Sequence, residues 1–354
     1  MSRFFSERHR SLAPYVPGEQ PRDMQYVKLN TNESPFAPPQ AVLDAVREAA
    51  AQAHLYPDPA AAQLTAALAA RYGVDKSEVI LGNGSDEILN FAFMAFCDTE
   101  HGAAFPDITY GFYPVFAALH GIPFAEVPLR EDFTIGLADY AGRREVLFIA
   151  NPNAPTGIAL PPEEIEALLA ADPNRLVVVD EAYVDFGARS CVPLIHVYDN
   201  LLVVQTFSKS RSLAGARLGM GFGCGALIAD LHAIRNSTNP YNVSRMGMAA
   251  GLAMLACEEE MKANCAAVAE NRAFTAAALR ELGFSLTPST ANFVFAAHPA
   301  IGGEELYLRL KERGVLVRHF SLPRIRAYNR ITIGTREQMQ TLLAAIQTIL
   351  EEKR

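Results

Sequence analysis

Four short apolar runs mark the first part of the chain as a set of buried strands. They are bounded by turn residues and lie at 78–81 (EVIL), 145–150 (EVLFIA), 175–180 (RLVVVD) and 201–207 (LLVVQTF). Because these runs are continuously apolar and do not alternate, they are typical of strands covered on both faces, as in a parallel sheet. The helical stretches SDEILNFAFMAF and PPEEIEALLA follow the first two runs. The pattern predicts an α/β protein with a three-layer α/β/α domain around a mostly parallel sheet.

The last part of the chain has a different pattern, which predicts a smaller C-terminal α/β domain. An Ala-rich helical stretch at 246–280 precedes NFVFA, GVLVRHF and RITIGT, and an amphipathic helix follows them. The opening segment is rich in proline and lacks periodicity, which favours an extended arm. We therefore expect an N-terminal arm at 1–26 that forms part of the small domain, a large domain at 27–250 and the small domain at 251–354.

Composition narrows the class of partner. The 354 residues are half hydrophobic, which is ample for a core larger than that of one compact domain. A net charge of -8 argues against nucleic-acid or membrane surfaces, because those partners select a basic face, so we expect small-molecule substrates. No apolar run is long enough to cross a bilayer, and the polar start lacks the core of a signal peptide, so we expect a cytoplasmic protein. The five cysteines and eight histidines show no metal-ligand spacing, so no metal site is expected.

A lysine follows the run at 201–207, within the segment TFSKSRSLAGARLGM. A lone lysine at a strand end is most often solvated. Here Lys209 is accompanied by Thr206, Ser208 and Arg217, which are groups that can surround a phosphate. An amine that forms a Schiff base needs a lowered pKa, and burial and a nearby arginine both act in that direction. Lys209 is therefore a candidate Schiff-base lysine.

A carboxylate and a phenol follow the run at 175–180. An acid at a strand end is often only a helix cap or an ion-pair partner. An enzyme that uses pyridoxal 5'-phosphate (PLP), however, needs a carboxylate against the pyridine nitrogen so that the ring accepts electrons. Asp180 suits that role, and Tyr183 could hydrogen-bond the ring's 3-hydroxyl. We interpret the neighbouring Glu181 as structural.

A glycine turn before the helical stretch SDEILNFAFMAF is a candidate anion site. Backbone amides at Ser85 and Asp86, exposed by Gly84, can bind a phosphate with the help of the helix dipole. An ordinary capped helix is the alternative, and it does not exclude the anion site. Two aromatics are weaker candidates: Tyr110 could stack on a flat cofactor ring and Tyr56 lies in a loop, although both residue types most often serve packing.

Eleven short motifs run through nearly the whole chain: LNTNESP, YPDP, GNGSDEIL, ITYGFY, NPNAPTG, DEAYVDF, TFSKSRSLAGARLG, PYNVS, ANFVF, GVLVR and RITIGT. In this order they resemble the fold-type I PLP enzymes, and specifically the histidinol-phosphate aminotransferase family. The resemblance implies the PLP-dependent transferase fold and amino transfer between L-histidinol phosphate and 2-oxoglutarate, in histidine biosynthesis.

The resemblance also implies roles for individual residues. Lys209 forms the Schiff base and then moves the proton between the substrate's α carbon and the cofactor. Asp180 pairs with the pyridine nitrogen, Tyr183 with the 3-hydroxyl, and Tyr110 stacks on the ring. The cofactor phosphate is held by the turn at Gly84, by the amides of Ser85 and Asp86, by Thr206 and Ser208, and by Arg217. Tyr56 reaches the phosphate of the neighbouring subunit, which implies a homodimer.

Four residues are implied at the substrate: Tyr15, Asn32, Arg318 and Arg330. A guanidinium group binds a phosphate or carboxylate through two hydrogen bonds, which suits an anionic substrate. The alternative for Arg318 is a structural ion pair within its apolar run. Arg324 and Arg326 lie in the same loop, and the sequence does not rank them.

One position departs from the family's motif NPNNPTG. The asparagine before PTG, which in the family donates to the cofactor's 3-hydroxyl, is Ala154 here. Alanine cannot make that bond. Our hypothesis is that Tyr183 makes the contact alone, or that Asn153 or a water substitutes, and that the pKa of the Schiff base is raised.

Four other functions are alternatives. An aromatic amino acid transaminase or a decarboxylase of a phosphorylated amino acid would keep the same lysine, aspartate and phosphate site. A non-catalytic PLP-binding regulator is a more remote alternative. Such regulators carry an added DNA-binding domain, and we expect none in this chain. A nicotinamide dehydrogenase is disfavoured because no GxGxxG motif follows an early strand.

Overall fold

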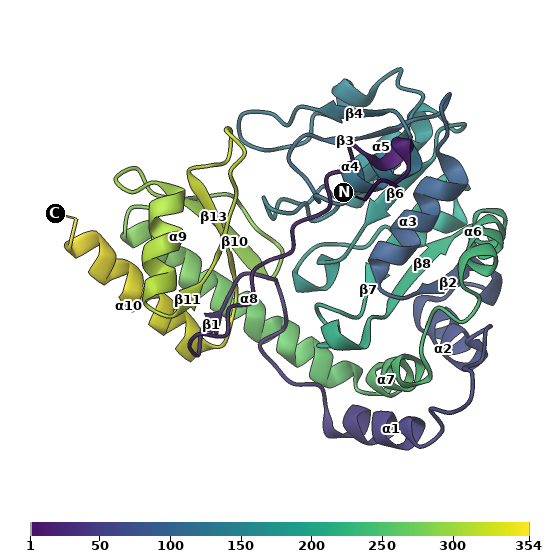
Figure 1. Ribbon diagram of the computed structural model, residues 1–354, viewed down its shortest axis with the longest axis horizontal. Helices are drawn as coiled ribbons and strands as arrows, with labels where there is room; N and C mark the ends of the chain where they lie inside the picture. The colour runs from purple at the N-terminus through teal and green to yellow at the C-terminus, as the bar shows by residue number, and fades with distance from the viewer. Residues whose placement is uncertain (1, 354) are drawn as a thin grey trace.

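The computed structural model describes residues 2–353 and contains a large sheet and a smaller one, each with its own helices (Figure 1). The large sheet has the strand order β2-β8-β7-β6-β5-β3-β4. Its strands are β2 (Val79–Gly82), β3 (Ala103–Pro106), β4 (Phe124–Val127), β5 (Val146–Ala150), β6 (Val177–Asp180), β7 (Leu201–Thr206) and β8 (Gly219–Gly223). Strand β8 is antiparallel to both of its neighbours, whereas β7, β6, β5, β3 and β4 pair in parallel. The predicted α/β fold with a mostly parallel sheet is confirmed.

Helices cover both faces of this sheet, which explains why its strands are continuously apolar. Along β5, Phe148 faces a core that it shares with α3 (Ser85–Phe96), α4 (Tyr113–His120) and α6 (Gly225–Thr238). The preceding residue, Leu147, faces the opposite core. That core is shared with α2 (Ala62–Tyr72), α5 (Pro162–Ala171) and α7 (Arg245–Ala256), and α1 (Gln40–Ala50) packs against α7.

The smaller sheet is antiparallel, with the strand order β12-β13-β10-β9. Its strands are β9 (Ser285–Leu286), β10 (Phe293–Ala297), β12 (Arg318–His319) and β13 (Tyr328–Thr332), and its helices are α8 (Glu258–Glu281), α9 (Gly303–Glu312) and α10 (Arg336–Glu351). A separate parallel pair joins β1 (Val27–Lys28) to β11 (Val315–Leu316). The chain that leads into the large sheet is thus first paired with the C-terminal part.

The N-terminal arm contacts both parts of the molecule (Figure 1). Arg8 donates to the carbonyl oxygen of His120 at the end of α4, and the Glu19 carboxylate pairs with Lys311 of α9. Short 3-10 helices lie at Glu7–His9, Lys76–Glu78, Leu137–Tyr140, Val184–Phe186, Val192–His196 and Ala214–Ala216. Among residues 2–353, no helix combines the length and the apolar character needed to span a membrane.

Candidate active site

A cavity of about 260 Å³ opens beyond the carboxyl ends of β5, β6 and β7. This is where the loops of a parallel sheet gather functional side chains. Nine residues that the sequence predicted to bind a cofactor line it: Ser85, Asp86, Tyr110, Asp180, Tyr183, Thr206, Ser208, Lys209 and Arg217. The fold therefore brings together groups that lie more than a hundred residues apart in sequence.

Lys209 lies in the loop after β7, and its Nζ donates to the carbonyl oxygen of Thr31 at 3.2 Å. Burial of the amine is the main cause that lowers its pKa to about 8, and the positive charge of Arg330 is the next. Arg217, which the sequence suggested as the responsible charge, acts in the same direction to a smaller extent. Near neutral pH the uncharged, nucleophilic fraction of this amine is therefore far larger than that of an ordinary lysine.

Asp180 is the last residue of β6 and is only 6% exposed. Its carboxylate accepts hydrogen bonds from the hydroxyl of Tyr113 and the amide of Ala182, both at 3.2 Å. Burial, followed by the charge of Asp86, raises the pKa of Asp180 to about 7. Both of its donors are uncharged, so the carboxylate is suited to a cationic partner such as a protonated ring nitrogen.

The start of α3 forms one end of the cavity. Gly84 precedes the helix with φ 85°, and a Cβ there would lie 2.5 Å from Nη2 of Arg217. On the sheet side, a Cβ on Gly219 would lie 2.4 Å from the amide nitrogen of Ser85. The two glycines thus allow the helix amides, the guanidinium group and the sheet to approach one another closely.

Two hydroxyls also line the cavity. Thr206 and Ser208 are buried, and their oxygens lie 3.0 Å apart. Nη2 of Arg217 lies 3.2 Å from the carboxylate of Asp86, which also accepts from the hydroxyl of Tyr110 at 2.6 Å. The cavity thus contains helix amides, hydroxyls and a guanidinium group as hydrogen-bond donors. It also contains a buried carboxylate and the amine of Lys209. This set of groups fits PLP.

Three of the predicted substrate residues, Tyr15, Arg318 and Arg330, are engaged with the chain itself. The ring of Tyr15 stacks on Phe112 with centroids 4.2 Å apart. Arg318 donates to the carbonyl oxygens of residues 16 and 17 at 3.1 and 3.3 Å. Nη2 of Arg330 donates to the carbonyl oxygen of Asn30 at 3.0 Å, and its buried Nε has no protein partner.

The other two predicted contacts are not made at the cavity of this single chain. The side chain of Asn32 is buried and hydrogen-bonded to Tyr183 and Thr332, so its predicted contact with substrate stays a prediction. Tyr56 is 77% exposed and stacks on Tyr241 at the outer surface. Arg324, which the sequence left unranked, pairs with Asp107 at 3.4 Å.

Ala154 lines the cavity and packs with Tyr183, Phe293 and Ala291. The neighbouring Asn153 is fully occupied elsewhere: its amide donates to Ile108 and Thr156, and its oxygen accepts from Thr109 at 2.7 Å. Asn153 therefore cannot substitute for the missing asparagine, and that part of our hypothesis is wrong. Tyr183 remains as the side-chain donor at this position.

The sequence missed two contributors. Tyr113 is fully buried and donates to Asp180, and its only signal was its spacing of three residues from Tyr110 in the motif YGFYP. Thr31 contributes a backbone carbonyl oxygen to Lys209, and a main-chain group leaves no signature in the side-chain pattern. Among residues 2–353, no group of three or more His, Cys, Asp or Glu side chains is arranged to hold a metal ion.

The fold and the cavity together define a PLP-dependent enzyme of the aminotransferase class. Consistent with this, residues 24–346 match the family model described as aminotransferase class I and II.

Comparison with known proteins narrows the class. The chain is 50% identical over 353 residues to a histidinol-phosphate aminotransferase of Marinomonas sp. (strain MWYL1), covering 99% of this chain and 100% of that protein. It is 48% identical over 350 residues to histidinol-phosphate aminotransferase 1 of Bradyrhizobium diazoefficiens, with 99% and 100% covered. The crystal structure of histidinol-phosphate aminotransferase from Sinorhizobium meliloti in complex with pyridoxal-5'-phosphate superimposes with a TM-score of 0.86 at 27% identity, covering 93% of this chain and 92% of that chain. The chain belongs to the histidinol-phosphate aminotransferase family.

Proposed function

We propose that this enzyme transfers the amino group between L-histidinol phosphate and 2-oxoglutarate, as a step of histidine biosynthesis in the cytoplasm. The observation that carries the proposal is that Lys209 and Asp180 line the same cavity as Ser85 and Asp86 at the start of α3. The relatives that carry the name of this activity cover almost the whole chain, which supports the substrate.

Five groups would hold the cofactor. The amides at Ser85 and Asp86, the hydroxyls of Thr206 and Ser208, and Arg217 would hold its phosphate, because each is a hydrogen-bond donor at the same end of the cavity. When bound, PLP withdraws electrons from the substrate's α carbon and so makes its proton acidic.

Asp180 would keep the ring nitrogen protonated. Burial disfavours the charged form of this carboxylate when no cation is near it. A protonated ring nitrogen beside Asp180 would therefore stabilise the charged carboxylate. Tyr113 holds this carboxylate in place through its hydroxyl. Lys209 would attach the cofactor and, once released, take the proton from the α carbon with Nζ and return it to the cofactor. Its lowered pKa suits both roles, because Nζ must accept a proton as well as donate one.

The substrate's phosphate would bind at the mouth of the cavity, where Arg330, Arg318 and Tyr15 gather. Arg330 offers a buried Nε without a protein partner. Arg318 holds the carbonyl oxygens of the arm at residues 16 and 17, so an anion that bound Arg318 would also order the arm beside Tyr15. The arm would then cover the substrate.

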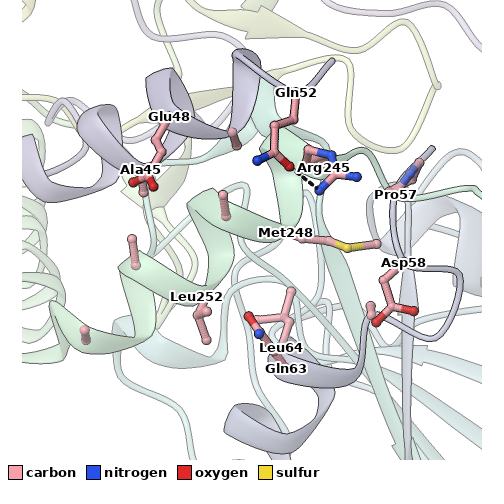
Figure 2. Close-up of a pocket in the computed structure, with 15 residues that line it drawn as sticks. Ala45, Glu48, Gln52, Pro57, Asp58, Gln63, Leu64, Arg245, Met248 and Leu252 are labelled. Atoms are coloured by element: carbon pink, nitrogen blue, oxygen red, sulfur yellow. Dashed lines mark hydrogen bonds between the residues drawn. The ribbon is translucent and has the colours of Figure 1, made fainter. Parts of the chain in front are cut away.

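A second copy of the chain would complete the site. Tyr56 and Leu55 are exposed on the outer surface, next to a hollow of about 670 Å³ between α1, α2 and α7 (Figure 2). Figure 2 shows the apolar side chains of Leu64, Met248 and Leu252 in this hollow. An exposed aromatic beside an apolar hollow suits the interface of a homodimer, in which Tyr56 would reach the partner's cofactor phosphate.

The experiment is a spectroscopic screen of the cofactor-loaded enzyme with single amines. Histidinol phosphate should convert the cofactor to pyridoxamine phosphate faster than phenylalanine or tyrosine does. Faster conversion by the aromatic amino acids would identify an aromatic transaminase instead, and release of carbon dioxide would identify a decarboxylase. A neighbour of 24% identity, L-threonine-O-3-phosphate decarboxylase from Porphyromonas gingivalis, shares the fold with a TM-score of 0.82, so fold likeness does not separate the activities.

A further inference from the structure

The segment 29–33 touches three of the side chains that the activity requires. The carbonyl oxygen of Asn30 accepts from Arg330, the carbonyl oxygen of Thr31 accepts from Lys209, and the side chain of Asn32 donates to Tyr183. The same segment is attached to the smaller sheet, because the amide of Thr332 donates to the carbonyl oxygen of Leu29 at 2.9 Å. It therefore links the cavity with β13.

Asn32 is the central residue of this link. It is 1% exposed and adopts a left-handed conformation, with φ 55°. Its Nδ2 donates to the hydroxyl oxygen of Tyr183 at 3.0 Å, and its Oδ1 accepts from the hydroxyl of Thr332 at 2.9 Å. Its backbone amide donates to the same Thr332 hydroxyl, and its carbonyl oxygen accepts from Asn292, both at 3.0 Å. Every polar atom of Asn32 thus has a partner.

This arrangement decides where the hydroxyl hydrogen of Tyr183 can point. A phenol has one hydrogen to donate and accepts through its oxygen. Because Asn32 supplies a donor to that oxygen, Tyr183 keeps its own hydrogen for another acceptor, and Tyr183 is one of the residues that line the cavity. Burial raises the pKa of Tyr183, and the hydrogen bond donated by Asn32 opposes that rise because it favours the ionised phenol.

We propose that Asn32 is a positioning residue that aims the hydroxyl of Tyr183 at the cofactor's ring oxygen and ties this orientation to strand β13 through Thr332. The inference rests on one part of the proposed function, which is that the protein binds PLP, and it does not depend on the substrate. The orientation of the Tyr183 hydroxyl matters more in this protein because the nearby Ala154 offers no second donor to the cofactor's ring oxygen. The charged groups around Tyr183 are Arg330, Asp180, Asp86 and Lys209, whose Nζ lies 5.8 Å from the ring centroid.

The test is the pH titration of the bound cofactor's visible absorbance. A donor to the ring oxygen draws away the electrons that hold the proton on the attached lysine nitrogen, so loss of the donor raises the titration midpoint. We expect Asn32→Gly, which tolerates the left-handed backbone, to raise the midpoint by roughly 0.4 to 1 pKa unit, the worth of one hydrogen bond at 1.36 kcal/mol per unit. Thr332→Val should move it in the same direction by a smaller amount.

A double-mutant cycle separates this role from general loosening of the fold. In a Tyr183→Phe background, Asn32→Gly should leave the midpoint unmoved, because there is no hydroxyl left to orient. A matched control is Asn329→Ala, which loses a buried side-chain hydrogen bond to the carbonyl oxygen of Gly303 at 2.9 Å in strand β13. It should not change the midpoint in the wild-type background.

Two outcomes would overturn the inference. One is an equal shift by Asn32→Gly with and without the Tyr183 hydroxyl. The other is an unmoved midpoint in both Asn32→Gly and Thr332→Val, although the cofactor is bound. If Asn32→Gly does not fold, Thr332→Val alone carries the comparison in the two backgrounds. A wild-type protein that takes up no cofactor would instead overturn the proposed function, so the two failures are distinguishable.

Discussion

Nζ of Lys209 lies 3.2 Å from the carbonyl oxygen of Thr31, and Arg330 is the charge that most lowers the pKa of this amine. The amine is thus held by a backbone oxygen and made less basic by burial and by an arginine of β13. The reactivity of Lys209 therefore depends on parts of the chain that are far from it in sequence.

The first prediction concerns the rate at which the apoprotein captures PLP. Only the uncharged amine of Lys209 is nucleophilic, so the rate should rise with pH and level off above about 8. Arg330→Met removes a positive charge, raises the pKa of Lys209 and should move the midpoint to higher pH. Stopped-flow absorbance measures the rate. Arg189→Met, which breaks an exposed pair with Glu163, should leave the profile unchanged. Equal profiles in all three proteins would contradict the assignment.

The second prediction concerns cofactor affinity in Asp180→Asn. The amide cannot pair with a protonated ring nitrogen. Loss of one partner of a buried pair costs about 3 to 5 kcal/mol, which weakens PLP binding by roughly a hundredfold or more. Equilibrium dialysis of the apoprotein gives the affinity. An unchanged Kd would remove Asp180 from the cofactor site.

The third prediction concerns the stability of the same variant without cofactor. In the folded apoprotein the pKa of Asp180 is about 7, above the value of about 3.9 for an unfolded chain. A raised folded-state pKa means that Asp180's contribution to stability is present below about pH 3.9 and is lost as pH rises through 7. Asp180→Asn avoids that loss, so its apoprotein should melt above the wild type at pH 8, and the gap should shrink toward pH 5. Calorimetry that finds a gap independent of pH would contradict this origin.

The fourth prediction uses the position at which the chain departs from its family. Ala154→Asn adds a donor beside Tyr183 and should lower the midpoint of the bound cofactor's absorbance titration by roughly 0.4 to 1 pKa unit. Ala154→Val adds volume without a donor and should leave the midpoint in place. If the two variants shift it equally, packing and not hydrogen bonding controls the cofactor at this position.

The fifth prediction tests the homodimer. Tyr56→Glu puts a negative charge where the partner's phosphate would bind, and Lys209→Ala removes the amine, so each variant alone should be nearly inactive. When both are coexpressed, half of the dimers are mixed and each mixed dimer has one intact site. About a quarter of the wild-type activity should return, as random pairing of a symmetric dimer requires. No recovery in dimers purified with two different tags would show that Tyr56 does not act across the interface.

The strands of the large sheet that the sequence predicted are buried on both faces, and two of the strands it missed, β8 and β4, have identifiable reasons. Apolar runs at 78–81, 145–150, 175–180 and 201–207 became β2, β5, β6 and β7. Strand β8 has the sequence GMGFG, and glycine is depleted in strands, so propensity does not reveal it. The edge strand β4 is short and partly exposed, and it carries Glu126.

The cavity was predictable to a similar extent and for a related reason. Side chains that follow predicted strands, such as Asp180 and Lys209, could be placed because the carboxyl ends of parallel strands meet at one edge. The partners of Asn32 could not, because Tyr183 and Thr332 are distant in sequence and only the fold brings them to it. The idea that Asn153 replaces the missing donor failed because its three hydrogen bonds are local to its own turn and the loop before α4.

The glycines of β8 have a consequence for how the enzyme could be altered. Gly219 lies so close to the start of α3 that the smallest side chain would displace the helix. Strand β8 would therefore set how closely a phosphate bound at the start of α3 could approach the sheet. Residues that never touch the ligand would then fix its height, and redesign of the enzyme for a differently sized cofactor would have to begin in this strand.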